Sequence, residues 1–192
     1  MSGSVGDNTA RASGVIAAAG GGGAWTQVST QTASADTEID FTTLSADYRD
    51  FLLIGSNIKF AVAADMWFRV DAGSGFAAAD YKYGMLGTDS GGAGSNVNSN
   101  SSAQVNLNYH GWDKASPYGG ALQVIVFDVH NTANYKMMHC AYDYWDNNHE
   151  LTCGRGSGTY DGASTAITGL RIMPASGNFP SGAFTLYGRK TT

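Results

Sequence analysis

From Ala24 onward, short runs of β-branched and aromatic residues recur roughly every 10 to 15 residues, separated by stretches rich in Gly, Ser and Asn. Several runs alternate apolar and polar residues. TEIDFTT places Ile39 and Phe41 on one face, which is typical of a half-buried strand. No segment keeps a helical spacing of apolar residues long enough to form a helix. About nine short strands with long connections predict an all-β protein, an antiparallel β-sandwich that is jelly-roll-like.

The run GAFTLYGRK near the C-terminus has the clearest alternation. Phe184 and Leu186 face one way, whereas Thr185 and Tyr187 face the other, after a turn that contains Pro180. We therefore expect this run to be the strand that completes the sandwich, so that the end of the domain is structural.

Composition supports an all-β protein and excludes some functions. The chain has 26 Gly and only two Glu, so turn residues abound while residues that stabilise solvated helices are scarce. The net charge of -5 offers no basic surface for a phosphate backbone, so we expect no nucleic-acid partner. No stretch approaches the ~20 apolar residues of a membrane helix, and the N-terminus lacks the pattern of a secretory signal, so we expect no membrane association and no export by a cleaved signal.

The first 23 residues differ from the rest of the chain. Residues 1–23 lack periodicity and end in four glycines, which predicts an extended arm and hinge ahead of a β-sandwich domain over residues 24–192. Val5, Val15 and Ile16 are apolar groups able to dock on a neighbour, and Arg11 is the arm's one basic residue. These four are the candidate partner-binding residues of the arm. The alternative is that the arm is a disordered terminus.

Several Gly- and Ser-rich stretches read as loops. The polar stretch from Thr88 to Ala103 predicts a long surface loop, and RGSGTYDGAST predicts another. YKMMHCAYDYWD and ELTCG predict a hairpin that turns at NNH. Cys140 and Cys153 flank this turn, and the register that would bring them together is not fixed by sequence. Two small buried thiols are favoured over a disulfide, because no export is expected and the cytosol is reducing.

No constellation of residues predicts catalysis or a resident cofactor. His139 and Cys140 are adjacent in a strand and so point to opposite faces, which argues against a shared metal ion. Asp143, Asp146 and Glu150 are better explained as turn caps than as a catalytic pair. The oxygen-rich loops DAGSGFAAAD and TDSGGAGSN lack the EF-hand pattern, which leaves calcium as a minor alternative. We expect no catalytic residue, no metal, no cofactor and no enzymatic activity.

Aromatic side chains in loop-like segments are the other candidates for binding. Trp112 and Tyr118 lie in HGWDKASPYGG, and Trp145 lies near the predicted hairpin turn. Exposed aromatic side chains stack on sugars or anchor protein interfaces. Trp112, Tyr118 and Trp145 are therefore the candidate partner-binding residues of the domain, whereas most other aromatic residues are expected to fill the core.

Three stretches together resemble a pattern of structural proteins from the virions of tailed bacteriophages: YRDFLLIGSNI, MWFRVDAGSGFAAADYKYG and RIMPASGNFPSGAFTLYGRK. VGDNTARASGVI also resembles segments near the start of such proteins, and the resemblance covers about a third of the chain. It implies a non-enzymatic virion protein, with no catalytic residues to carry over. The polar stretch from Thr88 to Ala103 matches no part of the pattern.

The resemblance implies two positions in the virion. The first is a capsid decoration, or cement, protein on the outside of the shell, assembled as a homotrimer and bound to the major capsid protein. The second is a tail-fibre, tailspike or receptor-binding module, in which Trp112 and Trp145 would hold a host glycan. A free carbohydrate-active enzyme is a third and weaker alternative, because no acid/base pair stands out.

Overall fold

The computed structural model describes residues 24–108, 111–113 and 119–190 of the 192-residue chain. Within them there are strands and no helix, and therefore no helix long and apolar enough to cross a membrane. Twelve strands follow one another along the chain: β1 (Trp25–Ala33), β2 (Ile39–Thr42), β3 (Tyr48–Lys59), β4 (Met66–Asp71), β5 (Tyr81–Asp89), β6 (Gly94–Ser102), β7 (Val105–Asn106), β8 (Gly120–Val126), β9 (Lys136–Trp145), β10 (Leu151–Tyr160), β11 (Gly169–Pro174) and β12 (Ser181–Lys190).

Eight of these strands form a jelly roll. One sheet contains the order β1-β12-β3-β8, and the facing sheet has the order β2-β11-β4-β7. Among these eight strands the first pairs with the last, the second with the seventh, the third with the sixth and the fourth with the fifth, all antiparallel. This is the arrangement of a long hairpin rolled into two sheets, so the predicted jelly-roll-like β-sandwich is confirmed.

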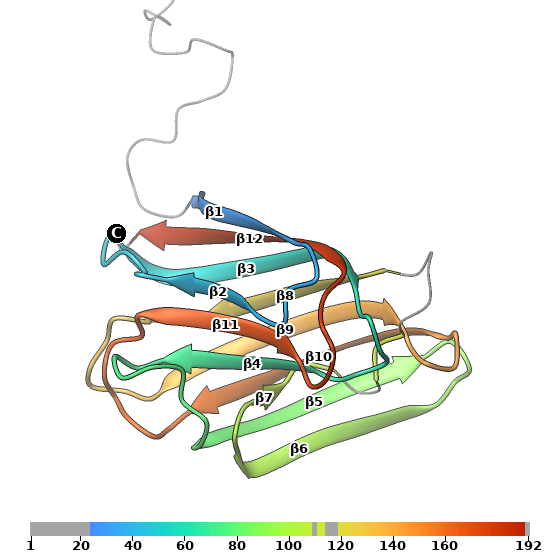
Figure 1. Cartoon of the computed structure of the whole chain (residues 1–192). Coiled ribbons are helices and arrows are strands. Elements are labelled where there is room, and N and C mark those ends of the chain that lie inside the picture. Colours follow the sequence, from blue (N-terminus) through green and yellow to red (C-terminus); the bar gives the residue numbers. More distant parts are fainter. Residues whose placement is uncertain (1–23, 109–110, 114–118, 191–192) are drawn as a thin grey trace, which may run out of the picture.

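Two further hairpins, β5–β6 and β9–β10, extend one of the two sheets. They add four strands beyond β8 and give an eight-stranded sheet with the order β1-β12-β3-β8-β9-β10-β5-β6 (Figure 1). β1 and β6 are therefore the two edges of this sheet, and residues 1–23 precede the β1 edge.

The core lies between the two sheets and follows the period of two along each strand. On β9 every second side chain is buried, from Lys136 to Tyr144, and on β12 Phe184 and Leu186 are buried as the sequence predicted. Met66, Phe68 and Val70 of β4 face them from the smaller sheet. Burial of such side chains is the main stabilising contribution to a sandwich of this kind.

The loop prediction is wrong for part of the polar stretch from Thr88 to Ala103 and for part of RGSGTYDGAST, because both contain strands. Residues 94–102 of the polar stretch form β6, and residues 155–160 of the Gly/Ser-rich stretch belong to β10. β6 pairs with β5 alone at the sheet edge, so it needs little apolar character. In β10, Gly154 and Gly156 leave room for large neighbours: the Tyr142 hydroxyl crosses the strand and donates a hydrogen bond to the Leu86 carbonyl at 3.2 Å.

Other local predictions are confirmed. β9 and β10 form the expected hairpin, and Oδ1 of Asp146 caps its turn by accepting hydrogen bonds from the backbone N–H groups of Asn148 and Glu150. Both cysteines are free thiols, and Cys140 is buried on the inner face as expected. The expectation of burial is wrong at Cys153, which is exposed on the outer face because the neighbouring Thr152 takes the inward position in β10. The register of β3 against β8 shifts between Gly55 and Ile58.

Candidate interaction surface

The outer face of the extended sheet is the candidate functional surface of the described residues. β8, β9, β10 and β5 bury one face against the core and leave the other uncovered by any described element. We call this uncovered side the open face and define it by six outward side chains: Leu86, Gln123, Ile125, His139, Ala141 and Arg155.

Strand register determines how these side chains are arranged. Gln123 lies opposite Ala141, Ala141 lies opposite Arg155, and Arg155 lies opposite Leu86, which makes one row across four strands. The adjacent row runs from Ile125 through His139 to two small residues. Opposed residues in an antiparallel sheet have their Cβ atoms about 4.5–5.5 Å apart, so each row is a continuous surface.

Small residues in the middle of the open face leave a groove there. The second row ends at Ser157 and Gly84, and Ala141 is the central residue of the first row. Longer side chains stand around these positions, which leaves a groove of about 470 Å³ beside a second groove of about 540 Å³. Both grooves are lined by Leu86, Ala141 and Arg155, so they adjoin along β10.

The open face is apolar for an exposed surface. Leu86 is 61% exposed, and Met137 and Leu151 extend the apolar surface toward the two ends of the β9–β10 hairpin. Arg155 forms no ion pair with any residue that the structure describes, and the His139 ring packs edge-on against Phe127 with 5.1 Å between centroids. An exposed apolar patch with one basic group is typical of a surface that binds another macromolecule.

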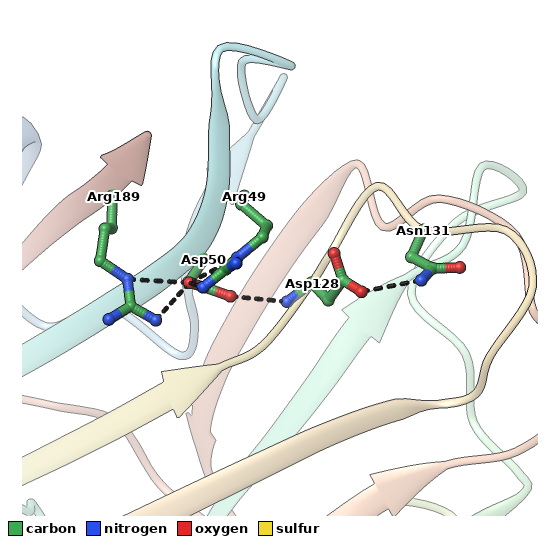
Figure 2. Close-up of polar contacts among 5 residues, drawn as sticks. All are labelled: Arg49, Asp50, Asp128, Asn131 and Arg189. Carbon is green, nitrogen blue, oxygen red and sulfur yellow. Dashed lines mark hydrogen bonds and ion pairs between the residues drawn. The ribbon is translucent and has the colours of Figure 1, made fainter. Parts of the chain in front are cut away.

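A second feature lies where β1 begins. Trp25, the first residue of β1, is opposite Arg189 of β12, and the guanidinium of Arg189 lies 5.3 Å from the centre of the Trp25 indole. Arg189 also donates hydrogen bonds from Nε and Nη2 to the Asp50 carboxylate at 2.9 and 2.5 Å (Figure 2). The start of β1, where residues 1–23 join the domain, is therefore linked to β12 through Arg189 and, through Asp50, to β3.

Asp50 is the centre of that network. Its side chain is 1% exposed and also accepts hydrogen bonds from Arg49 and from the backbone N–H of Asp128 (Figure 2). The carboxylate of Asp128 accepts a hydrogen bond from the side-chain amide of Asn131 in turn (Figure 2). Burial alone would raise the pKa of Asp50, but the hydrogen bonds from Arg49, Asp128 and Arg189 outweigh it and lower the pKa. Asp50 thus stays ionised and joins β3, β12 and the loop after β8.

The seven candidate partner-binding residues fall into three groups. Val5, Arg11, Val15, Ile16 and Tyr118 lie outside the described residues. Trp145 is half-buried at the end of β9, opposite the exposed Leu151 of β10, and so lies at one end of the sheet surface that carries the open face.

Trp112 is a correction. It is 1% exposed, because it stacks between Phe60 and Tyr144 with centroid distances of 5.3 and 4.4 Å. The prediction of an exposed aromatic side chain available to a partner is therefore wrong at this position. Backbone hydrogen bonds with Ala64 in both directions draw its segment into the sandwich.

Sequence reasoning missed both the open face and the Asp50 network. The continuous apolar run of β8, in which Ile125 faces outward while Val124 and Val126 face the core, was the one local signal for the open face. Asp50 directly precedes the apolar run FLLI, and its partner Arg189 is far away in the sequence. No family model and no curated protein sequence matches this chain.

Proposed function

We propose that this chain is a non-enzymatic structural protein of a bacteriophage virion, and that it acts as a capsid decoration protein. In this role it binds the major capsid protein on the outside of the shell, assembles as a homotrimer and stabilises the particle. The observation that carries the proposal is the exposed apolar open face of the sandwich, combined with residues 1–23, which lead into an edge strand whose first residue, Trp25, contacts Arg189. The resemblance to phage virion proteins points the same way.

The N-terminal segment supplies the contacts between subunits in this proposal. Val5, Val15 and Ile16 bring apolar surface to a neighbour, and Arg11 brings a positive charge. The cation–π contact between Trp25 and Arg189 keeps the base of the segment in place. Binding of the folded protein to the assembled shell stabilises both by mass action, without any chemical step.

The open face suits a second contact of the same kind. Its central residues are Ala, Ser and Gly, so few charged groups lose water when the surface is covered. Leu86 and Ile125 offer apolar surface that gains from burial, and Arg155 can pair with an acidic group of the partner.

The alternative is a tail-fibre, tailspike or receptor-binding module. Trp145 and Leu151 favour it, because they lie side by side near the tip of a hairpin, and jelly rolls also serve as lectins. The burial of Trp112 removes one of the two aromatic residues on which the glycan-binding hypothesis was based.

Copy number separates the two roles. We would quantify the protein in purified virions by mass spectrometry with labelled peptide standards, relative to the major capsid protein. Hundreds of copies per particle support decoration of the shell. A few dozen copies or fewer would contradict it and move the protein to the tail.

A further inference from the structure

Three carboxylates meet at the tips of the two hairpins that extend the jelly roll. One oxygen from each of Asp89, Asp146 and Glu150 lies within 4.8 Å of the other two. Asp89 ends β5, while Asp146 and Glu150 border the turn between β9 and β10. Asp89 and Asp146 are buried, and Glu150 is half-buried. This carboxylate cluster is separate from both the open face and the Asp50 network.

Strand register explains why these residues meet. Asp89 lies directly opposite Thr152 of β10, and Asp146 and Glu150 are joined across the turn by the N–H of Asp146 and the carbonyl of Glu150 at 2.9 Å. Glu150 is two residues before Thr152, so their side chains lie on the same face of the chain. Glu150 also packs against Gly91 in the turn between β5 and β6.

Thr152 provides an independent indication of a ligand. Its side chain is fully buried, at 0% exposure, yet its Oγ1 has no hydrogen-bond partner among the described residues. Because Thr152 and Asp89 are opposed in an antiparallel pair, their side chains project from the same face of the sheet and are neighbours there. A buried hydroxyl without a partner costs free energy, so its retention beside three carboxylates points to a bound group.

Charge leads to the same conclusion. Neither Asp89 nor Glu150 forms an ion pair with a residue that the structure describes. The Asp89 carboxylate accepts a hydrogen bond from the backbone N–H of Ala93 at 2.9 Å, which positions Oδ1 without cancelling the charge of Asp89. Like charges at this separation repel one another strongly when they are partly buried.

We propose that Asp89, Asp146, Glu150 and Thr152 Oγ1 bind a calcium ion. Three oxygen atoms within 4.8 Å of one another share a point that is at most about 2.8 Å from each, so small side-chain adjustments bring them to the Ca²⁺–oxygen distance of about 2.4 Å. The donors are all oxygen, and carboxylates dominate, as a hard cation prefers. The half-buried position of Glu150 leaves room for water to complete the coordination, and flexible geometry of this kind favours calcium over magnesium.

The ion would connect the turns of two hairpins. Asp89 belongs to the β5–β6 hairpin, and the other three residues belong to the β9–β10 hairpin. These two hairpins form the part of the large sheet that the jelly roll itself does not contain. Calcium would therefore fix the tips of the added strands, and this role does not depend on whether the protein decorates a capsid.

The first test measures thermal unfolding of the full-length protein after treatment with EDTA, with and without added CaCl₂. At a calcium concentration about tenfold above the dissociation constant, we expect the midpoint to rise by about 3–6 °C. Asp89→Asn and Glu150→Gln should each abolish the rise. Asp143→Asn is the matched control, because Asp143 is an exposed carboxylate on the outer face of the same hairpin, and it should retain the full rise.

The second test uses Thr152→Val, which preserves the shape of the side chain and removes the hydroxyl. Without metal, this variant should be at least as stable as the original protein, because an unpaired buried hydroxyl has been removed. Its calcium-induced rise should nevertheless shrink. Terbium chloride provides a direct signal, since light absorbed by the nearby Trp112 or Tyr144 would be transferred to Tb³⁺ and emitted, and CaCl₂ should quench the emission by competition.

Three results would overturn the proposal. They are the absence of a calcium-induced rise in the EDTA-treated protein, an equal rise with MgCl₂, and a rise that Asp89→Asn and Asp143→Asn retain alike. If Asp89→Asn fails to fold, Thr152→Val still decides the question, because an unchanged rise in that variant excludes the hydroxyl as a ligand.

Discussion

Replacing Asp50 with Asn tests whether the buried carboxylate network holds the start of β1 to the sandwich. Asp50 is 1% exposed and accepts hydrogen bonds from two guanidinium groups and one backbone N–H (Figure 2). Asn has almost the same volume but no charge, so the change removes the electrostatic part of the network and leaves the packing. One amide oxygen remains to accept the N–H of Asp128.

The structure sets the expected magnitude. Breaking a buried ion pair costs about 3–5 kcal/mol when the surviving charge stays buried. The side chains of Arg49 and Arg189 are 43% and 30% exposed, so water can take up the donors that Asp50 releases. We therefore expect Asp50→Asn to lower the free energy of unfolding by about 2–4 kcal/mol at pH 7.

The effect should depend on pH. The pKa of Asp50 is lower in the folded protein than the unfolded value of about 3.9, so its contribution is present above that pH. The contribution is lost as the pH falls through the folded-state pKa, because the carboxylate is then protonated in both states. The difference in stability between the original protein and Asp50→Asn should shrink accordingly in acid.

Urea denaturation followed by tryptophan fluorescence, at pH 7 and at several lower values, measures both effects. Asp40→Asn is the control: Asp40 also receives two hydrogen bonds from one arginine, Arg171, at 2.7 and 2.6 Å, but it is more exposed. We expect that control to cost about 1 kcal/mol or less. Equal losses for the two variants, or a loss for Asp50→Asn that does not change with pH, would refute the reasoning.

Two further predictions concern the extended sheet. Gly156→Ala should destabilise the protein by about 2–4 kcal/mol in the same assay, because the added Cβ meets the backbone of Gly84 and Met85, whereas Gly84→Ala, where nothing lies within 4 Å, should change stability by less than about 1 kcal/mol. In the native protein a maleimide should modify Cys153 and spare Cys140, because burial raises the pKa of the Cys140 thiol to about 12. Modification of Cys140 at the same rate without denaturant would contradict its placement in the core, and peptide mass mapping distinguishes the two sites.

The fold was predictable where each strand carries its own signal. In β12 and β4, apolar and polar residues alternate, and the structure buries the side chains that this alternation selects. β6 has no such signal, because an edge strand that pairs with β5 alone can be polar on both faces. β10 also lacks a signal, because its glycines accommodate side chains that belong to neighbouring strands.

The candidate sites were harder to predict because they depend on contacts between distant residues. Trp112 resembles an exposed loop residue in its local sequence, and only its stacking between Phe60 and Tyr144 places it in the core. The carboxylate cluster follows from the pairing of β5 with β10, which brings Asp89 to Glu150 and cannot be inferred from the spacing of either residue. Asp146 was expected to cap a turn, and it does.

The proposed role in capsid decoration can be tested most directly by deleting residues 2–23 and measuring occupancy. Every strand among the described residues begins at or after Trp25, so we expect the shortened protein to keep its β-rich circular dichroism spectrum. Full-length and shortened protein would be mixed with undecorated capsids, and bound copies would be counted by cryo-electron microscopy. We expect the full-length protein to fill its sites and the shortened protein to leave them largely empty. Equal occupancy by both would contradict the account.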